Sequence, residues 1–201
     1  VARMTGTQSA LGKLIDGVCD YVVFVSAYLL LAIVLDTRFP GLAWPLVLTA
    51  GAAHALQAAA YEAQRQMFDY WALGKESARL GTNVQQPPQT VGTAMLYGYE
   101  WLQLQITAIT PAFLAALGQR IGQPGKDNPQ SVAYGERFAP AVRRWGILCP
   151  NYRTYGIFLA CLFDHPEVYF VAEIALLGLA YLALLVWQRG LNRAFIAEAV
   201  V

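Results

Sequence analysis

The sequence predicts an all-α fold: a polytopic transmembrane helix bundle with about four membrane spans, plus one helix at the cytoplasmic interface. The 201 residues are 57% hydrophobic and 13% charged, and the mean hydropathy is +0.40, as is typical of multi-pass membrane proteins. Apolar runs alternate with short polar turns, and the basic residues gather on one predicted side. The net charge of +1 gives no indication of nucleic-acid binding, and the three cysteines follow no metal-binding spacing.

The first two spans are predicted to form a hairpin. One helix should run through residues 12–35, because its second half carries no charge. Residues 36–41 form a polar turn with helix-breaking Pro and Gly. A second helix should cross over 42–60 and continue along the membrane surface over 61–75, where charged and aromatic residues mix. We expect His54, inside the second span, to be a hydrogen-bonded packing residue rather than a ligand.

The second half of the chain is less regular. It contains a polar linker (76–91), an ambiguous apolar segment interrupted by Pro111 (92–118), a basic loop-like segment (119–146), a short apolar span (155–163, extended backward by 145–149), a polar turn (164–167) and the clearest span (168–187).

The basic residues favour one topology. If residues 92–118 lie on or re-enter the cytoplasmic surface, four spans place every Lys and Arg except Arg38 on one side. This agrees with the positive-inside rule. We therefore expect one integral membrane domain over 1–201, with 76–146 as a cytoplasmic loop and interfacial helix inserted in it.

Acidic residues mark the entrance of the first span. Gly12, Asp16 and Asp20 recur every four residues, so a helix places them on one stripe with the carboxylates about 6 Å apart along the axis. Acids at the mouth of a membrane helix are costly unless they bind something, and paired carboxylates suit a hard divalent cation. The alternative is that both acids only stabilise the helix, through their attraction to the positive, N-terminal end of its dipole.

These residues carry a family resemblance. Ala2, Arg3, eight residues, Gly12, Asp16 and Asp20 resemble the second half of the signature D-x2-D-G-x2-A-R-x8-G-x3-D-x3-D of the CDP-alcohol phosphatidyltransferases. The first half of the signature would lie before Val1. We therefore expect an N-terminal part to be missing, with two more spans that complete a six-helix bundle, and we expect these 201 residues alone to bind metal weakly without turnover.

The resemblance implies the chemistry of phospholipid biosynthesis. A phosphatidyl or phospho-alcohol group would pass from a CDP-activated substrate, such as CDP-diacylglycerol, to an alcohol acceptor, and CMP would leave. Asp16 and Asp20 would be ligands of Mg²⁺ or Mn²⁺, and Asp20 would also be the general base. The CDP moiety would contact Ala2, Arg3, Thr5 and Gly12. The active site would face the cytoplasm from a multi-pass membrane protein.

The acceptor is left open by the sequence. Four arginines, Arg65, Arg143, Arg144 and Arg153, would suit a phosphorylated acceptor, but they satisfy the positive-inside rule without any substrate. The partners implied are the CDP-linked substrate, the acceptor and membrane lipids, with a homodimer as an option and no nucleic acid. The rival interpretation is a non-catalytic transporter or assembly subunit, in which the acids form an intramembrane cation site.

Overall fold

The computed structural model describes the backbone of residues 10–80 and 90–198, together with the side chains of these residues apart from 10–20 and 91. Every regular element in these ranges is helical, as predicted. The elements are α2 (Ala10–Asp36), α3 (Ala43–Trp71), η1 (Glu76–Ala78), α4 (Val91–Ile106), α5 (Pro111–Ile121), α6 (Pro129–Trp145), η3 (Gly146–Leu148), α7 (Pro150–Leu162), α8 (Pro166–Ala172), η4 (Glu173–Leu177) and α9 (Gly178–Ala197).

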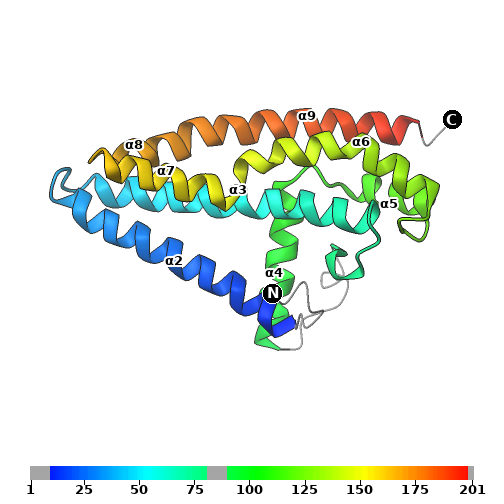
Figure 1. The fold of residues 1–201 in the computed structure, drawn as a ribbon, viewed down its shortest axis with the longest axis horizontal. Coiled ribbons are helices and arrows are strands. Elements are labelled where there is room, and N and C mark those ends of the chain that lie inside the picture. Colours follow the sequence, from blue (N-terminus) through cyan, green and yellow to red (C-terminus); the bar gives the residue numbers. More distant parts are fainter. Residues whose placement is uncertain (1–9, 81–89, 199–201) are drawn as a thin grey trace.

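The predicted hairpin of α2 and α3 is present. The two helices meet at a tight turn and diverge from it (Figure 1). Within the turn, an Asp36 carboxylate oxygen accepts a hydrogen bond from the Gly41 amide at 3.2 Å. Gly41 has a φ of 77°, a conformation that glycine adopts without steric cost. The polar turn therefore ends one helix and starts the next within a few residues of the predicted boundaries.

The prediction of a loop over 119–146 is wrong for most of that segment. Residues 129–145 form α6, which begins where the Asn128 side chain accepts a hydrogen bond from the Gln130 amide and Pro129 occupies the first helical turn. Its buried side chains recur at three- and four-residue spacing: Ser131, Tyr134, Phe138, Ala141 and Trp145. The basic residues lie between them, so high polarity concealed an amphipathic helix.

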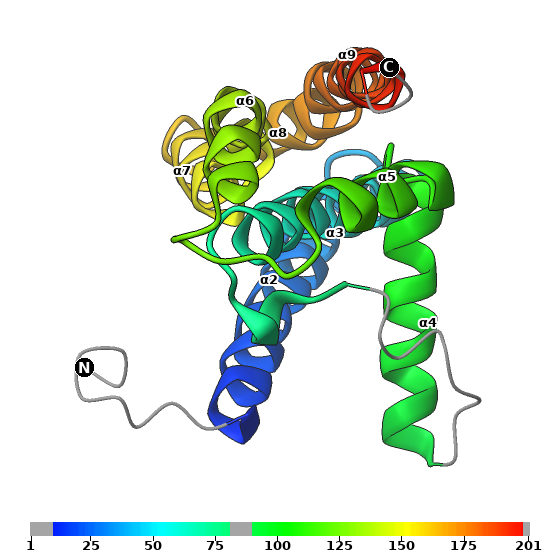
Figure 2. The same ribbon diagram turned by 90° about the vertical axis from the view of Figure 1, so that its right-hand side faces the viewer.

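The segment 92–118 is broken where Pro111 predicted it. Helices Gly92–Ile106 and Pro111–Ile121 meet at an angle of 95°. Thr110 caps the second of them by accepting a hydrogen bond from the Phe113 amide at 3.2 Å. Both views show α4 running from this break to the same side of α3 as α2 (Figures 1 and 2). The bend excludes one straight crossing, while placement of α4 at the membrane surface stays a prediction.

The C-terminal helix is the longest in the part of the chain that the structure describes. Elements α8, η4 and α9 form a continuous helix, Pro166–Ala197, whose most apolar window has a mean hydropathy of 2.2 and is only 17% buried. A helix at the centre of a soluble protein would be mostly buried, so the exposure favours a lipid-facing helix. In the described part of the chain it is the one unbent helix long and apolar enough to cross a membrane. The count of four spans stays a prediction.

The two ends of the bundle differ in charge. The α2–α3 turn and the turn before α8 lie together, and Arg38 and Asp164 join them at 2.7 Å. Helices α5 and α6 and the end of α9 lie at the opposite end (Figure 1), where Phe113, Phe138 and Phe195 pack as one aromatic cluster. Arg120, Arg137 and Arg193 belong to α5, α6 and the end of α9, whereas Arg38 lies at the turn end.

Candidate active site

The acidic stripe lies on a helix. The backbone of α2 is helical from Ala10 onward, so Gly12, Asp16 and Asp20 share one face with about 6 Å of rise between neighbours. Their side chains are outside the description, as are Ala2, Arg3 and Thr5 altogether. The helical backbone places the Asp16 and Asp20 positions one turn apart, and aspartate is a residue type that suits an oxygen-preferring divalent cation.

The α2–α3 hairpin fixes the height of this stripe, which is its distance along the helices from the contact between Tyr28 and His54. The Tyr28 hydroxyl lies 3.0 Å from Nδ1 of His54, which confirms the predicted packing role of His54. Since α2 and α3 run in opposite directions, Asp20 and Glu62 are each eight residues, about 12 Å of rise, from that contact. The backbone of Asp20 and that of Glu62 therefore lie at similar heights above that contact, on two helices that diverge (Figure 1).

Arg65 lies close to that height and already has partners. One of its guanidinium nitrogens is 2.6 Å from Glu62, and another is 3.9 Å from Asp69. The hydrogen bond to Glu62 raises the pKa of the Arg65 guanidinium above its usual value. Its side chain is 43% exposed, so it remains accessible from solvent, and its predicted contact with an acceptor stays a prediction.

A cavity brings the other three predicted arginines together. It has a volume of about 1170 Å³ and lies between the α6–η3–α7 segment and the α8–η4–α9 helix, with Tyr61 of α3 on its wall. Arg143, Arg144 and Arg153 line it, while Leu176 and other apolar residues of the long helix form much of its surface. Arg144 stacks over the Trp187 ring at 4.5 Å, a contact that orients the guanidinium.

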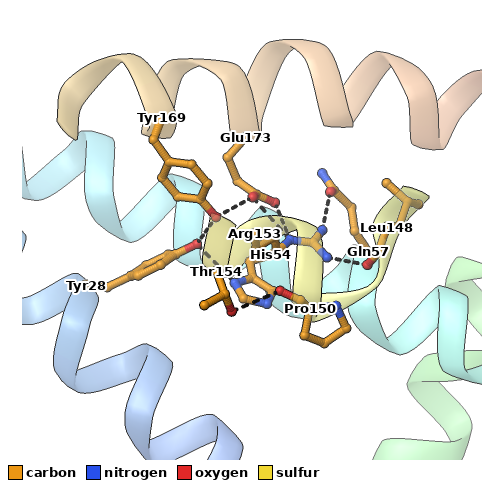
Figure 3. Close-up of polar contacts among 9 residues, drawn as sticks. All are labelled: Tyr28, His54, Gln57, Leu148, Pro150, Arg153, Thr154, Tyr169 and Glu173. Carbon is orange, nitrogen blue, oxygen red and sulfur yellow. Dashed lines mark hydrogen bonds and ion pairs between the residues drawn. The ribbon is translucent and has the colours of Figure 1, made fainter. Parts of the chain in front are cut away.

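Arg153 differs from its neighbours because its charge is fully neutralised within the protein. Its Nε lies 3.0 and 3.1 Å from the two carboxylate oxygens of Glu173, and neither side chain is exposed. One terminal nitrogen donates to the Gln57 side-chain oxygen at 2.7 Å, and the other donates to the Leu148 carbonyl. Figure 3 shows this arrangement, in which every guanidinium nitrogen has a protein partner.

Sequence reasoning missed Glu173, Tyr169 and Tyr28. Tyr169 donates to Glu173 at 2.8 Å, and its hydroxyl lies 2.9 Å from that of Tyr28 (Figure 3). One signal was available, since Glu173 is the only charged residue within 168–187. A charge inside a span indicates a specific partner. Among the described side chains no group of three or more His, Cys, Asp or Glu residues could hold a metal.

Taken together, the fold and the site define a helical protein of membrane type with an acidic stripe at the start of α2 and an arginine-lined cavity between α6, α7 and the C-terminal helix. The family model described as CDP-alcohol phosphatidyltransferase matches residues 1–118, more than half of the chain, so the chain belongs to this family. The family is a group of transferases that act on CDP-alcohols in phospholipid synthesis and generally depend on a divalent metal. Neither the curated proteins nor the solved structures contain a match.

Proposed function

We propose that the protein transfers a phosphatidyl or other phospho-alcohol group from a CDP-activated substrate, such as CDP-diacylglycerol, to an alcohol acceptor, and releases CMP. The observation that carries this proposal is the spacing of Gly12, Asp16 and Asp20 at the start of α2, inside the segment that matches the family. In this proposal the stripe faces the cytoplasm and the chain crosses the membrane several times.

The reaction is a displacement at phosphorus. The acceptor hydroxyl oxygen forms a bond to the phosphorus of the substrate, and the bond from that phosphorus to the CMP oxygen breaks. Asp20 accepts the proton of the hydroxyl as general base. Asp16 and Asp20 would hold Mg²⁺ or Mn²⁺, which when bound offsets the negative charge of the pyrophosphate. Gly12 leaves room for the nucleotide near the backbone, and Ala2, Arg3 and Thr5 contact the CDP moiety.

The cavity supports a phosphorylated acceptor. Arg143 and Arg144 line it near Tyr61, one residue before Glu62 and so at about the height of Asp20. Two arginines that share a partly apolar cavity can bind a phosphate with charge-assisted hydrogen bonds. Because the guanidinium of Arg153 has protein partners on every nitrogen, we assign the acceptor phosphate to Arg143 and Arg144. Arg65, one helical turn from Tyr61 on α3, is a further candidate.

The test is CMP release by the full-length native protein in detergent micelles with MgCl₂. CDP-diacylglycerol would be offered with glycerol phosphate, inositol phosphate, serine, choline and a lipid alcohol in turn. We expect release with one acceptor class, its loss in Asp20→Asn, and normal release in the control Asp36→Asn, which changes an acid at the other end of α2. Binding of Mn²⁺ without CMP release from any pair would contradict the transferase proposal and favour a cation-binding membrane protein.

The cavity assignment needs its own measurement. Arg143→Gln and Arg144→Gln together should raise the KM for a phosphorylated acceptor while leaving the KM for the CDP substrate unchanged. Arg137→Gln, which changes an arginine of the same helix outside the cavity, is the matched control. An unchanged acceptor KM in the double variant would remove these arginines from the acceptor site.

A further inference from the structure

A chain of polar contacts crosses the middle of the bundle. It starts at Tyr28 on α2, passes through Tyr169 on α8 at 2.9 Å, and reaches Glu173 at 2.8 Å. Glu173 pairs with Arg153 on α7, which in turn binds Gln57 on α3 at 2.7 Å. The side chains of Figure 3 thus join two consecutive helix pairs, α2–α3 and α7–α8, which are far apart in the sequence.

Stability alone is a weak reason for this arrangement. The side chains of Arg153 and Glu173 are fully buried, and replacing a buried ion pair by apolar residues of similar size is often neutral or stabilising. Charged residues inside membrane helices generally serve a function. Glu173 also opens the π-helical turn η4, and such turns are frequent at functional sites.

The two ends of this chain of contacts lie in two regions that the proposed function uses, the cavity and α2. Tyr169, Glu173 and Arg153 line the cavity, whereas Tyr28 belongs to the helix that carries Asp16 and Asp20. Of the described α2 side chains, Tyr28, Ala32 and Leu35 are buried, and Tyr28 is the one among these three that makes hydrogen bonds. Apolar packing tolerates small rotations of a helix, but two directional bonds at one hydroxyl resist them.

We propose that Tyr28, Tyr169, Glu173 and Arg153 form a positioning relay that fixes the rotation and height of α2 against the cavity wall. By fixing α2 in this way, the relay sets the direction that the Asp16 and Asp20 positions face for the reaction. This inference rests on the proposed function, because it assigns the relay to the same two acids. Its residues touch no reacting atom and act through α2.

The first experiment removes one hydroxyl. Tyr28→Phe in the full-length protein should lower kcat for CMP release by about tenfold or more, because small misplacements of reacting groups have large effects on rate. The KM for the acceptor should stay unchanged. The matched control is Tyr181→Phe, which likewise removes one tyrosine hydroxyl; this hydroxyl donates to the Ile106 carbonyl and has no bond to α2. The assay uses CDP-diacylglycerol and the acceptor identified in the panel above.

Two results would overturn the relay. One is an unchanged kcat in Tyr28→Phe, and the other is an equal loss in Tyr28→Phe and Tyr181→Phe, which indicates general loosening. These outcomes are distinct from failure of the proposed function. If wild type releases no CMP, both proposals fall, whereas an active wild type that depends on Asp20 but not on Tyr28 removes only the relay.

A second variant separates position from stability. Arg153→Met combined with Glu173→Met replaces the ion pair by apolar side chains, and it should keep a melting temperature at or above that of wild type. We expect kcat to fall nevertheless, with the KM for the CDP substrate unchanged. A double variant that melts normally and turns over normally contradicts the proposal, because the pair would then have no effect beyond packing.

Discussion

Two Arg–carboxylate pairs lie in contrasting regions of the bundle. At the turn end, Arg38 and Asp164 are 2.7 Å apart, with side chains 39% and 80% exposed. In the middle, Arg153 and Glu173 are 3.0 Å apart and fully buried. The shorter pair is the one we expect to matter less, because water and salt screen an exposed pair while a buried charge depends entirely on its partner. Environment, rather than distance, therefore decides the importance of each pair.

The largest effect is expected from Glu173→Gln. This change leaves the Arg153 charge buried without a counter-charge, and breaking a buried pair in this way costs about 3–5 kcal/mol. Thermal unfolding in detergent should show a large fall in melting temperature or failure to fold. Glu136→Gln makes the same chemical change on an exposed position of α6 and should melt like wild type. Equal melting of the two variants would mean that burial does not set the strength of the central pair.

A smaller effect is expected from Gln57→Ala. The Gln57 oxygen accepts a hydrogen bond from the Arg153 guanidinium, and bonds to charged groups contribute about 1.5–3 kcal/mol. Gln66→Ala is the control on the same helix, because its amide binds Glu62 in a partly buried position. The free energy of unfolding from denaturant titration should separate the two variants, and a similar loss in both would argue against a special role for the central arginine.

At the turn end we expect only a slight change. Asp164→Asn removes the charge of the exposed pair and keeps a residue type that tolerates the φ of 60° found there. The melting temperature should fall slightly at low salt, and the difference from wild type should vanish at about 1 M NaCl. A large fall that persists in high salt would show that the exposed pair is as important as the buried one.

The smallest effect is expected from the contact between Arg137 and Glu198, at the end of the bundle opposite the α2–α3 turn. Its contribution to stability should depend on pH. The Arg137 side chain hydrogen-bonds to Glu198 and holds the pKa of that carboxyl below its usual value. A depressed pKa adds stability above the unfolded value, near pH 4, and this stability is lost as pH falls through the folded value. Melting temperatures of wild type and Glu198→Gln should therefore differ near neutral pH and converge in acid. A difference that grows in acid would contradict this sign.

The sequence was most informative where physical signals are local. The polar turn at 36–41 predicted where α2 ends and where α3 begins, and Pro111 predicted the break after α4. Residues 129–145 were misassigned because hydropathy averages the apolar stripe of α6 with its arginines. Of the four arginines proposed for an acceptor from the sequence, three line one cavity. Their role in binding an acceptor remains a prediction.

The central contacts were beyond local reasoning. Tyr28 and Tyr169 are 141 residues apart in sequence, and the local sequence around either residue does not predict their contact. The π-helical turn has no sequence signature that could be read from composition. Glu173 was visible as a lone charge in an apolar run, but its partner was not, since Arg153 lies on a helix whose packing depends on the whole chain.

The π-helical turn at Glu173–Leu177 also shifts the phase of the long C-terminal helix. One wider turn rotates the side chains of α9 relative to those of α8, compared with a regular helix. Tyr169 and Phe170 can therefore pack with α2 and α3, while Leu185 packs with Trp145 of α6. Deleting one residue in this segment would restore a regular pitch and bring the two halves out of register with their neighbours.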